Sequence, residues 1–389
     1  MTAPPPLRIG VVCFSTFGGS GVIAAETAIQ LAARGHDVHV FSDERPARLP
    51  AAGRSPGPSF HHVSAPDYPQ LKYPAYGMAL TSKIVEVSRR APLDIVHAHY
   101  ALPHAVAANL ARDILRADGD PAPRIVTTLH GTDITLIGSD PSFLPLTRFT
   151  IATSDAVTAP SLWLVDATRR TLAIPPSIGI HVVPNFVDVD RFTPAPAGAA
   201  KRERPVIVHV SNFRPVNRVD DVIAVFARLR ASRPVRLRLV GDGPERPRIE
   251  ADVAARGLAA DVDFLGERGD LPEVLRDADL FLLPSETESF GLAALEAMAC
   301  GVPVVASAVG GLVEVVADGE AGFLRPVGDV PALTDAAERL LSDEALRRAM
   351  GAAARRTAET RYRIDPAIDR YVDIYRTVTP SSSTRRASS

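Results

Sequence analysis

The sequence has little cysteine, with two residues of this type among 389, and it has no long apolar run. Cys13 and Cys300 lie far apart in apolar surroundings, so buried free thiols are expected rather than a disulfide, as in a reducing compartment. The first residues contain no basic segment before an apolar stretch, and no apolar run approaches the ~18 residues that cross a bilayer. These absences predict a cytoplasmic protein that does not bind a membrane.

An excess of charge of one sign is also missing. The chain has 43 basic and 45 acidic residues, and a formal net charge of -2 gives no indication of a nucleic-acid partner. The length is sufficient for two domains that each bury a core. We therefore expect two domains and no nucleic-acid partner, while a homo-oligomer stays open.

Strand-like and helix-like segments alternate along the chain. The β-branched run "LRIGVVCF", the helically spaced "GVIAAETAIQLAARG" and the run "HDVHVFS" together predict a βαβ unit. The pattern restarts after residue 200 with "RPVIVHVS", "RVDDVIAVFARLRA" and "RLRLVGDG". The predicted fold class is therefore α/β, with two doubly wound Rossmann-like domains that face each other across a cleft. In such folds ligands bind at the C-terminal ends of the strands.

We expect one domain over residues 1–195 and another over 200–364, joined by a linker rich in proline, alanine and charge. A C-terminal helix over 365–379 is predicted to cross back to the first domain. The polar tail 380–389 is predicted to be disordered. The helix is indicated by the spacing of Ile368, Tyr371, Val372 and Tyr375.

The end of the first predicted strand carries the glycine-rich stretch "FSTFGGSGVIA". Gly18, Gly19 and Gly21 lack β-carbons, so backbone N–H groups and the positive end of the following helix could approach a phosphate. The same letters fit a dinucleotide-binding fingerprint, with Asp43 where a ribose-binding acid would lie. A tight turn that simply requires glycine is a further interpretation. This stretch alone leaves an NAD-dependent oxidoreductase open.

Another strand end, "DLFLLPSETESFGLAALEAMAC", carries two acids eight positions apart. Glu288 lies at the entrance of a predicted helix, and Glu296 lies about two turns into it. A carboxylate in the entrance loop can accept hydrogen bonds from sugar hydroxyls, and one two turns along can hold a ribose. The alternative is that the acids only stabilise the helix dipole.

This stretch resembles the E-x7-E signature of retaining nucleotide-sugar glycosyltransferases of the glycogen synthase and sucrose synthase type, which have the two-domain GT-B fold. Three further segments resemble the same family in the same order, and the resemblance covers nearly the whole chain: "PNFVDVDRF", "VGDGPE" and "VDFLG". The resemblance implies that the first domain binds the acceptor and the second binds the nucleotide sugar. It also implies that Glu288 contacts the donor sugar and Glu296 the ribose hydroxyls.

Four other segments resemble a branch of family 4 that transfers N-acetylglucosamine from UDP-N-acetylglucosamine to the hydroxyl of L-malate, the first step of bacillithiol biosynthesis. These segments are "CFSTFGGSGVIAAE", "HAHYALPHA", "TTLHGTDITLIGSD" and "SNFRPVNRVDDVI". The resemblance implies UDP-N-acetylglucosamine and L-malate as ligands and a product that keeps the α configuration. An inositol phosphate or glycan acceptor stays open, as does a non-catalytic nucleotide-binding protein.

Charge that develops on the departing UDP requires fixed positive groups or a metal. The Asp-x-Asp triplets of this chain lie away from the glycine-rich turn, so we expect that no metal is required. Family members typically have an Arg and a Lys after the first strand of the second domain, where this chain has Asn212 and Asn217. Either Arg214 and Arg218 take over the diphosphate, or Asn217 weakens activity.

His130 follows the strand-like "RIVTTL", and the resemblance implies that it reaches the donor sugar. A core histidine, or a zinc ligand together with His97 and His99, are the alternatives. Malate is a dianion whose pocket needs cations and hydroxyl groups. Similarity to enzymes with an inositol phosphate acceptor supports a lysine, a tyrosine, a threonine and an arginine in that pocket, although Lys72 and Arg148 could equally be plain surface charges.

The predicted site can be stated in full. The catalytic candidates are Glu288, His130, Arg214 and Arg218. The donor-binding candidates are Gly18, Gly19, Ser20, Gly21, Asn212, Asn217, Gly241, Ser289, Phe290, Gly291, Leu292 and Glu296. The acceptor-binding candidates are Ser20, Lys72, Tyr100, Thr132 and Arg148, and no metal ligand is predicted. A covalent intermediate on Glu288 and a reaction on one face of the sugar both stay open.

Overall fold

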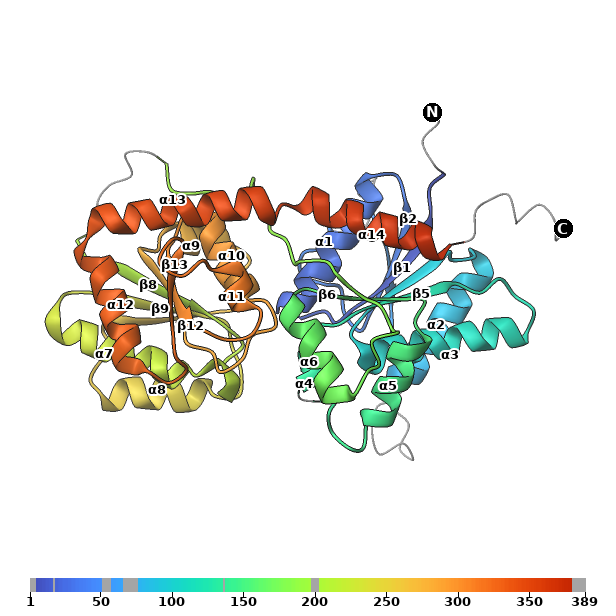
Figure 1. Cartoon of the computed structure of the whole chain (residues 1–389), viewed down its shortest axis with the longest axis horizontal. Coiled ribbons are helices and arrows are strands. Elements are labelled where there is room, and N and C mark those ends of the chain that lie inside the picture. Colours follow the sequence, from blue (N-terminus) through green and yellow to red (C-terminus); the bar gives the residue numbers. More distant parts are fainter. Residues whose placement is uncertain are drawn as a thin grey trace. The chain divides into compact units, whose positions relative to one another are not determined.

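The computed structural model describes residues 5–16, 18–50, 57–65, 76–135, 137–196 and 203–379. The chain divides into two compact units, Met1–Pro184 with Asp365–Ser389, and Asn185–Ile364. Each unit contains a parallel sheet flanked by helices (Figure 1). The predicted acceptor residue Lys72 and the tail 380–389 lie outside the described residues.

The first unit is built on a seven-stranded sheet with the order β3-β2-β1-β4-β5-β6-β7, and every pairing in it is parallel. Its strands are β1 (Arg8–Val12), β2 (Asp37–Ser42), β3 (Ser59–His62), β4 (Ile95–His99), β5 (Arg124–Thr128), β6 (Ala156–Ala159) and β7 (Ile180–Val182). Its helices are α1 (Gly19–Ala33), α2 (Tyr76–Arg90), α3 (Val106–Ala117), α4 (Thr132–Thr135), α5 (Leu144–Thr153) and α6 (Leu162–Leu172), with a π-helix η1 (Ala101–Ala105) and the C-terminal helix α14 (Ile364–Val378).

The second unit has a six-stranded parallel sheet with the order β10-β9-β8-β11-β12-β13. Its strands are β8 (Val206–Val210), β9 (Arg236–Val240), β10 (Val262–Gly266), β11 (Leu280–Leu283), β12 (Val304–Ser307) and β13 (Gly322–Arg325). Its helices are α7 (Val219–Ser232), α8 (Arg246–Ala255), α9 (Leu271–Arg276), α10 (Leu292–Ala299), α11 (Leu312–Val315), α12 (Val330–Ser342) and α13 (Glu344–Arg361), with a 3-10 turn η2 (Pro215–Asn217).

The central strands are apolar runs because helices cover both faces of each sheet. In the first unit, four of the five residues of β1 are buried, and β4 is buried throughout. In the second unit, all four residues of β11 are buried. Strands buried on both faces are typical of parallel α/β sheets. The predicted α/β class with two doubly wound sheets is therefore confirmed.

The strand order places a topological switch point in each sheet. In the first sheet it lies between β1 and β4, and in the second between β8 and β11. Ligands of open α/β sheets bind beyond the carboxyl ends of the strands at such a point, because the loops of the two neighbouring strands diverge there. The loops that follow these four strands contain most of the residues predicted to form the site.

The segment 185–195 groups with the second unit, whereas the sequence predicts that the first domain continues to residue 195. The physical reason is burial, because Val187, Val189 and Phe192 belong to the apolar core of the second unit. The Arg355 side chain of α13 also donates hydrogen bonds to the carbonyl oxygens of Val189 and Phe192, at 3.0 and 2.6 Å. Residues 185–195 are thus a packed part of the second unit.

The C-terminal helix α14 packs within the first unit. Its residues Tyr371 and Tyr375 are buried, and Asp365 and Asp369 form ion pairs with Arg34 at the end of α1, at 2.9 and 2.6 Å. The helix therefore packs aromatic side chains into the core of the first unit, and ion pairs attach it to α1 at the surface of that unit.

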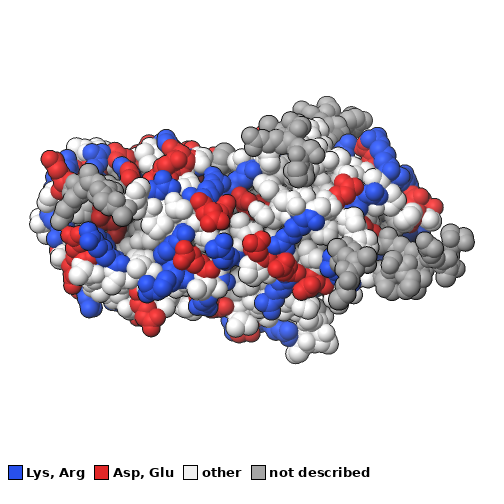
Figure 2. All heavy atoms as spheres, turned by 90° about the horizontal axis from the view of Figure 1, so that it is seen from above, with Lys and Arg blue, Asp and Glu red and all other residues white. Residues whose placement is uncertain are grey.

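Acidic and basic side chains alternate over the surface in Figure 2, without a large area of one sign on the face shown. The Asp-x-Asp triplets take part in this pattern of pairs. Asp118 and Asp120 both pair with Arg89, and Asp261 pairs with Arg204 and Arg230. Among the described helices, none is both long enough and apolar enough to cross a membrane.

Candidate active site

The glycine-rich turn of the first unit connects β1 to α1 at the switch point. Gly18 precedes α1 in an extended conformation, and Gly19, Ser20 and Gly21 form the first turn of the helix. A β-carbon at Gly21 would lie 2.5 Å from the Thr16 carbonyl oxygen, so the close approach of helix and turn requires glycine. The N–H groups of a first helical turn have no acceptors within the helix, so they are available to an anion.

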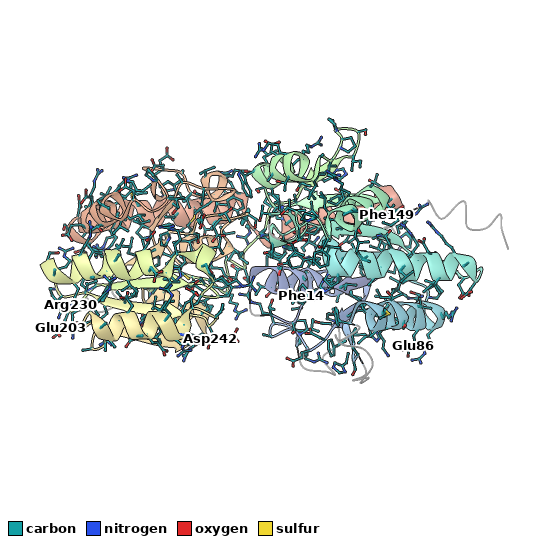
Figure 3. The ribbon with its side chains drawn as sticks, turned by 90° about the horizontal axis from the view of Figure 1, so that it is seen from below. Phe14, Glu86, Phe149, Glu203, Arg230 and Asp242 are labelled. Atoms are coloured by element: carbon teal, nitrogen blue, oxygen red, sulfur yellow. The ribbon has the colours of Figure 1, made fainter. Side chains whose placement is uncertain are left out.

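Aromatic rings join this turn to the end of the neighbouring strand β4. Tyr100 has a positive φ of 86°, and its ring centroid lies 5.4 Å from that of Phe14 and 4.9 Å from that of His130. Figure 3 labels Phe14 beside α1, and the ring centroid of Phe14 also lies 4.3 Å from that of His104. The structure thus brings together the loops that follow β1, β4 and β5.

His99 and His130 form a hydrogen-bonded pair at the ends of β4 and β5. Nδ1 of His99 lies 3.0 Å from Nε2 of His130. Burial lowers the pKa of His130 to about 3 and, together with the neighbouring histidines, lowers that of His99 well below its ordinary value. Both imidazoles are therefore neutral near pH 7. His97 uses its two ring nitrogens differently, because they lie 2.6 Å from the Thr128 hydroxyl and 2.7 Å from the Tyr375 hydroxyl.

Asp133, which sequence reasoning missed, holds the two loops together. Its Oδ1 accepts hydrogen bonds from the backbone N–H groups of His130 and Gly131, and its Oδ2 accepts one from Ala101, each at 3.0 Å. Burial raises the pKa of Asp133, and the three N–H donors oppose that shift. An aspartate that bonds backbone N–H groups two and three residues before it is a recognisable local motif, so "HGTD" contained a signal for this role.

The predicted acceptor residues differ in their surroundings. Tyr100, Thr132 and Ser20 are half-buried; Tyr100 directly follows β4, Thr132 begins α4 after β5, and Ser20 lies in the first turn of α1 after β1. Arg148 lies on α5, and its Nε donates to the Leu172 carbonyl oxygen at 2.6 Å, at the end of α6.

In the second unit, the loop after β8 contains the four residues expected near the diphosphate. Asn212 and Arg214 are exposed, whereas Asn217 is buried. The Oδ1 atom of Asn217 accepts a hydrogen bond from the Arg214 N–H at 3.0 Å. The side chain at the expected lysine position therefore closes the loop on itself, which explains how an asparagine is accommodated there.

Arg218, in the same loop, is held between Asp221 of α7 and Gly328 in the segment between β13 and α12. It has a positive φ of 50°, and its Nε donates to Asp221 at 2.7 Å. A β-carbon at Gly328 would lie 3.1 Å from a terminal nitrogen of Arg218, so glycine leaves room for the guanidinium group. The predicted donor residue Gly241 packs against the start of this loop, because a β-carbon there would lie 1.8 Å from the Ser211 carbonyl oxygen.

Glu288 lies in the loop between β11 and α10 and is half-buried. The Ser285 hydroxyl donates to its Oε1 at 3.0 Å. Burial raises the pKa of Glu288 to about 7, although the bond from Ser285 opposes the shift. The backbone of this residue is held by the next loop, since the Gly311 N–H donates to the Glu288 carbonyl oxygen at 2.9 Å. At Gly310, a β-carbon would lie 1.8 Å from that same oxygen.

The remaining donor candidates surround the start of α10. Gly291 precedes the helix, which begins at Leu292, and Phe290 is buried against the Tyr362 ring at 5.5 Å. Glu296 is 5% exposed within α10. Ser289 lies beside Glu288 and is half-buried. Glu288 and Glu296 thus extend from one loop and helix at the switch point of the second sheet.

Among the described residues, no three histidine, cysteine, aspartate or glutamate side chains converge in a way that could hold a metal ion. The zinc alternative required His97, His99 and His130 to bind the same zinc ion. In the structure His97 instead bonds Thr128 and Tyr375, while His99 and His130 bond each other. The three imidazoles therefore each take part in these hydrogen bonds.

Two doubly wound sheets, each with its candidate residues at the switch point, define the chain as a protein of the GT-B glycosyltransferase fold. Solved structures agree. Sucrose-phosphate synthase from Thermosynechococcus elongatus is similar with a TM-score of 0.79 and 24% identity, covering 96% of this chain and 99% of that one. Anabaena HepE in complex with UDP-glucose has a TM-score of 0.77 and 21% identity, covering 95% of this chain and 100% of that one.

Two family models match adjoining parts of the sequence, "Glycosyltransferase Family 4" over residues 17–191 and "Glycosyl transferases group 1" over residues 192–357. N-acetyl-alpha-D-glucosaminyl L-malate synthase of Bacillus anthracis is 43% identical over 375 residues, 95% of this chain and 96% of the relative. A D-inositol 3-phosphate glycosyltransferase of Stackebrandtia nassauensis is 32% identical over 381 residues, 87% of this chain and 82% of the relative. The chain belongs to the glycosyltransferase family of these relatives. The alternatives of an oxidoreductase and of a non-catalytic nucleotide-binding protein are set aside.

Proposed function

We propose that this enzyme transfers N-acetylglucosamine from UDP-N-acetylglucosamine to the hydroxyl group of L-malate and keeps the α configuration. The observation that carries the proposal is the 43% identity over 95% of the chain to a relative whose name states that activity. Relatives that act on inositol 3-phosphate share 32% identity in the example above, so an inositol phosphate acceptor is the second candidate. The cytoplasmic location expected from the sequence is part of this proposal.

The donor would bind to the second unit. Arg214 and Arg218 would contact the diphosphate, and of these Arg218 is better fixed because Asp221 holds its Nε and leaves its terminal N–H groups for phosphate oxygens. Glu296, in the first turns of α10, would accept hydrogen bonds from the ribose hydroxyls. Guanidinium groups that the protein holds in place stabilise the charge that develops on a leaving diphosphate, and they do so without reorganisation during the reaction. We therefore propose that no metal is required.

Glu288 would bind a sugar hydroxyl and would not act as a nucleophile. A carboxyl group with a pKa near 7 is only partly ionised at neutral pH, and Ser285 already occupies one of its oxygens. Both features favour hydrogen bonding to the sugar over attack on its anomeric carbon. We accordingly favour a reaction on one face of the sugar, in which the departing phosphate accepts the proton of the malate hydroxyl.

The acceptor would bind to the first unit. One malate carboxylate would lie at the first turn of α1, where the N–H groups near Ser20 are available to an anion. Tyr100 and Thr132 would supply hydroxyl groups from the neighbouring loops. Arg148 would contact malate only through its terminal N–H groups, because its Nε is bonded to the Leu172 carbonyl oxygen.

The test is to incubate the purified protein with UDP-N-acetylglucosamine, L-malate and EDTA, and to follow UDP release and the anomeric proton of the product by NMR. An α-linked malate product supports the acceptor, the stereochemistry and the absence of a metal requirement together. Parallel reactions contain D-malate or inositol 3-phosphate. Turnover with inositol 3-phosphate but not with L-malate would overturn the acceptor, and activity that returns only when Mg²⁺ replaces EDTA would overturn metal independence.

A pair of variants tests the role of the loop after β8. Arg218→Met should raise the KM for UDP-N-acetylglucosamine and lower kcat, each by ~10-fold or more, because a charge-assisted phosphate contact is lost. Arg214→Met, in the same loop but exposed, should have a smaller effect. A larger loss for Arg214→Met would show that the exposed arginine holds the diphosphate.

A further inference from the structure

Two hydrogen bonds link three histidines of the first unit, one from the His104 ring to the backbone of His99 and one between the His99 and His130 rings. Nδ1 of His104 bonds the backbone carbonyl oxygen of His99, and Nδ1 of His99 bonds Nε2 of His130 at 3.0 Å. The Nε2 atoms of His99 and His104 are buried and have no hydrogen-bond partner among the described residues. These contacts determine where each ring carries its proton.

The proton of His104 is fixed by its partner. A carbonyl oxygen only accepts, so the Nδ1 atom of His104 must be the N–H donor. Burial lowers the pKa of His104 to about 4, so the ring is neutral and Nε2 carries a lone pair. A buried lone pair without a donor costs less than a buried N–H group without an acceptor.

The same argument applies to His99. Its Nε2 is buried without a partner, so the less costly neutral form has the proton on Nδ1. That N–H group then donates to Nε2 of His130, which must accept. Because His130 is also neutral, its single proton lies on Nδ1.

We propose that His99 is a positioning residue that fixes His130 as its Nδ1–H tautomer, so that His130 offers the substrate a hydrogen-bond donor and no free lone pair. His130 therefore binds an oxygen atom of the ligand and cannot serve as a general base. The identity of that oxygen as a hydroxyl of the transferred sugar rests on the proposed function, whereas the tautomer does not.

The surroundings hold this arrangement in place. The His97 ring packs against the His99 ring with centroids 4.4 Å apart, and His97 is itself anchored to Tyr375 of α14 at 2.7 Å. Asp133 fixes the backbone of His130. Rotation of the His99 ring would require several buried groups to move, so the tautomer is built into the fold.

The primary test is NMR of the wild-type protein labelled with ¹⁵N-histidine, with the His130 signals assigned by comparison with His130→Gln. The expected pattern for His130 is a protonated, pyrrole-type Nδ1 and an unprotonated, pyridine-type Nε2. The reverse pattern, or shifts averaged between the two forms, would overturn the proposal. This measurement requires no turnover, so it separates a failure of the tautomer from a failure of the proposed reaction.

Two substitutions of His99 test its role as the positioning residue. His99→Asn places an amide N–H group near the position of Nδ1, and should keep the His130 pattern and most of kcat/KM. His99→Leu has no donor, and should yield a mixed His130 pattern and lower kcat/KM by ~10-fold or more, as expected for one lost hydrogen bond in a site. His181→Asn, on the edge strand β7, is the surface control. If His99→Leu keeps the wild-type pattern, His99 does not set the tautomer.

Discussion

The raised pKa of Glu288 predicts that this side chain opposes folding at neutral and alkaline pH. Its pKa is about 7 in the folded protein, against 4.5 for an unperturbed glutamate. One pKa unit corresponds to ~1.4 kcal/mol, so ionising the folded side chain costs up to ~3 kcal/mol more than ionising the unfolded one. Below pH 4.5 the group is neutral in both states and the cost vanishes. It grows as the pH rises and is complete above pH 7.

Glu288→Gln removes this titration and keeps the shape of the side chain. We expect the variant to gain stability relative to wild type as the pH rises, by ~2 kcal/mol between pH 5 and pH 8. The assay is thermal unfolding of both proteins at each pH, with the shift in Tm compared between them. For a unit of this size ~2 kcal/mol corresponds to roughly 4–8 °C. A difference in Tm between variant and wild type that stays constant from pH 5 to pH 8 would refute the reasoning.

Three further substitutions test how the site is held. Gly310→Ala should destabilise the protein by ~3 kcal/mol or more and raise the KM for the donor, because its β-carbon would lie 1.8 Å from the Glu288 carbonyl oxygen. The control is Gly319→Ala, which is also at positive φ but in open space and should cost only ~1–2 kcal/mol. Asp133→Asn should lower Tm and kcat together, since an amide nitrogen would face a backbone N–H group; an unchanged kcat would contradict its role. Arg355→Met should cost ~3 kcal/mol in urea unfolding, because buried carbonyl oxygens lose a charged donor.

The candidate site could be proposed from the sequence because its residues belong to local patterns. A glycine-rich turn after the first strand and two acids after a later one could be read directly, and the rule for strand ends then placed both at the edges of their sheets. Glu288 and Gly21 lie at those edges in the structure. The family resemblance supplied their expected roles, which the fold alone would not have given.

The side-chain contacts around the candidate residues could not be read in the same way, because they depend on strand pairing and on loop conformation. His99 and His130 are 31 positions apart and meet only because β4 and β5 pair with His99 opposite Thr128. Asn217 was judged by the lysine that it replaces, whereas its side chain caps the N–H of Arg214 in the same loop. Arg148 was proposed for its charge, and the structure adds that its Nε donates to the carbonyl oxygen of Leu172, 24 positions away.

In each unit one candidate residue is uncharged or partly charged near pH 7, and neighbouring groups set its protonation. In the first unit His130 is neutral and bonded to His99; in the second, burial raises the pKa of Glu288 to about 7, and the bond from Ser285 opposes that shift. In the proposed reaction, formal positive charge would come separately from Arg214 and Arg218 in the loop after β8. That division matches the demands of glycosyl transfer, in which negative charge accumulates on the departing diphosphate and not on the sugar hydroxyls. Cations are therefore most useful at the phosphate, and fixed neutral hydrogen bonds at the sugar.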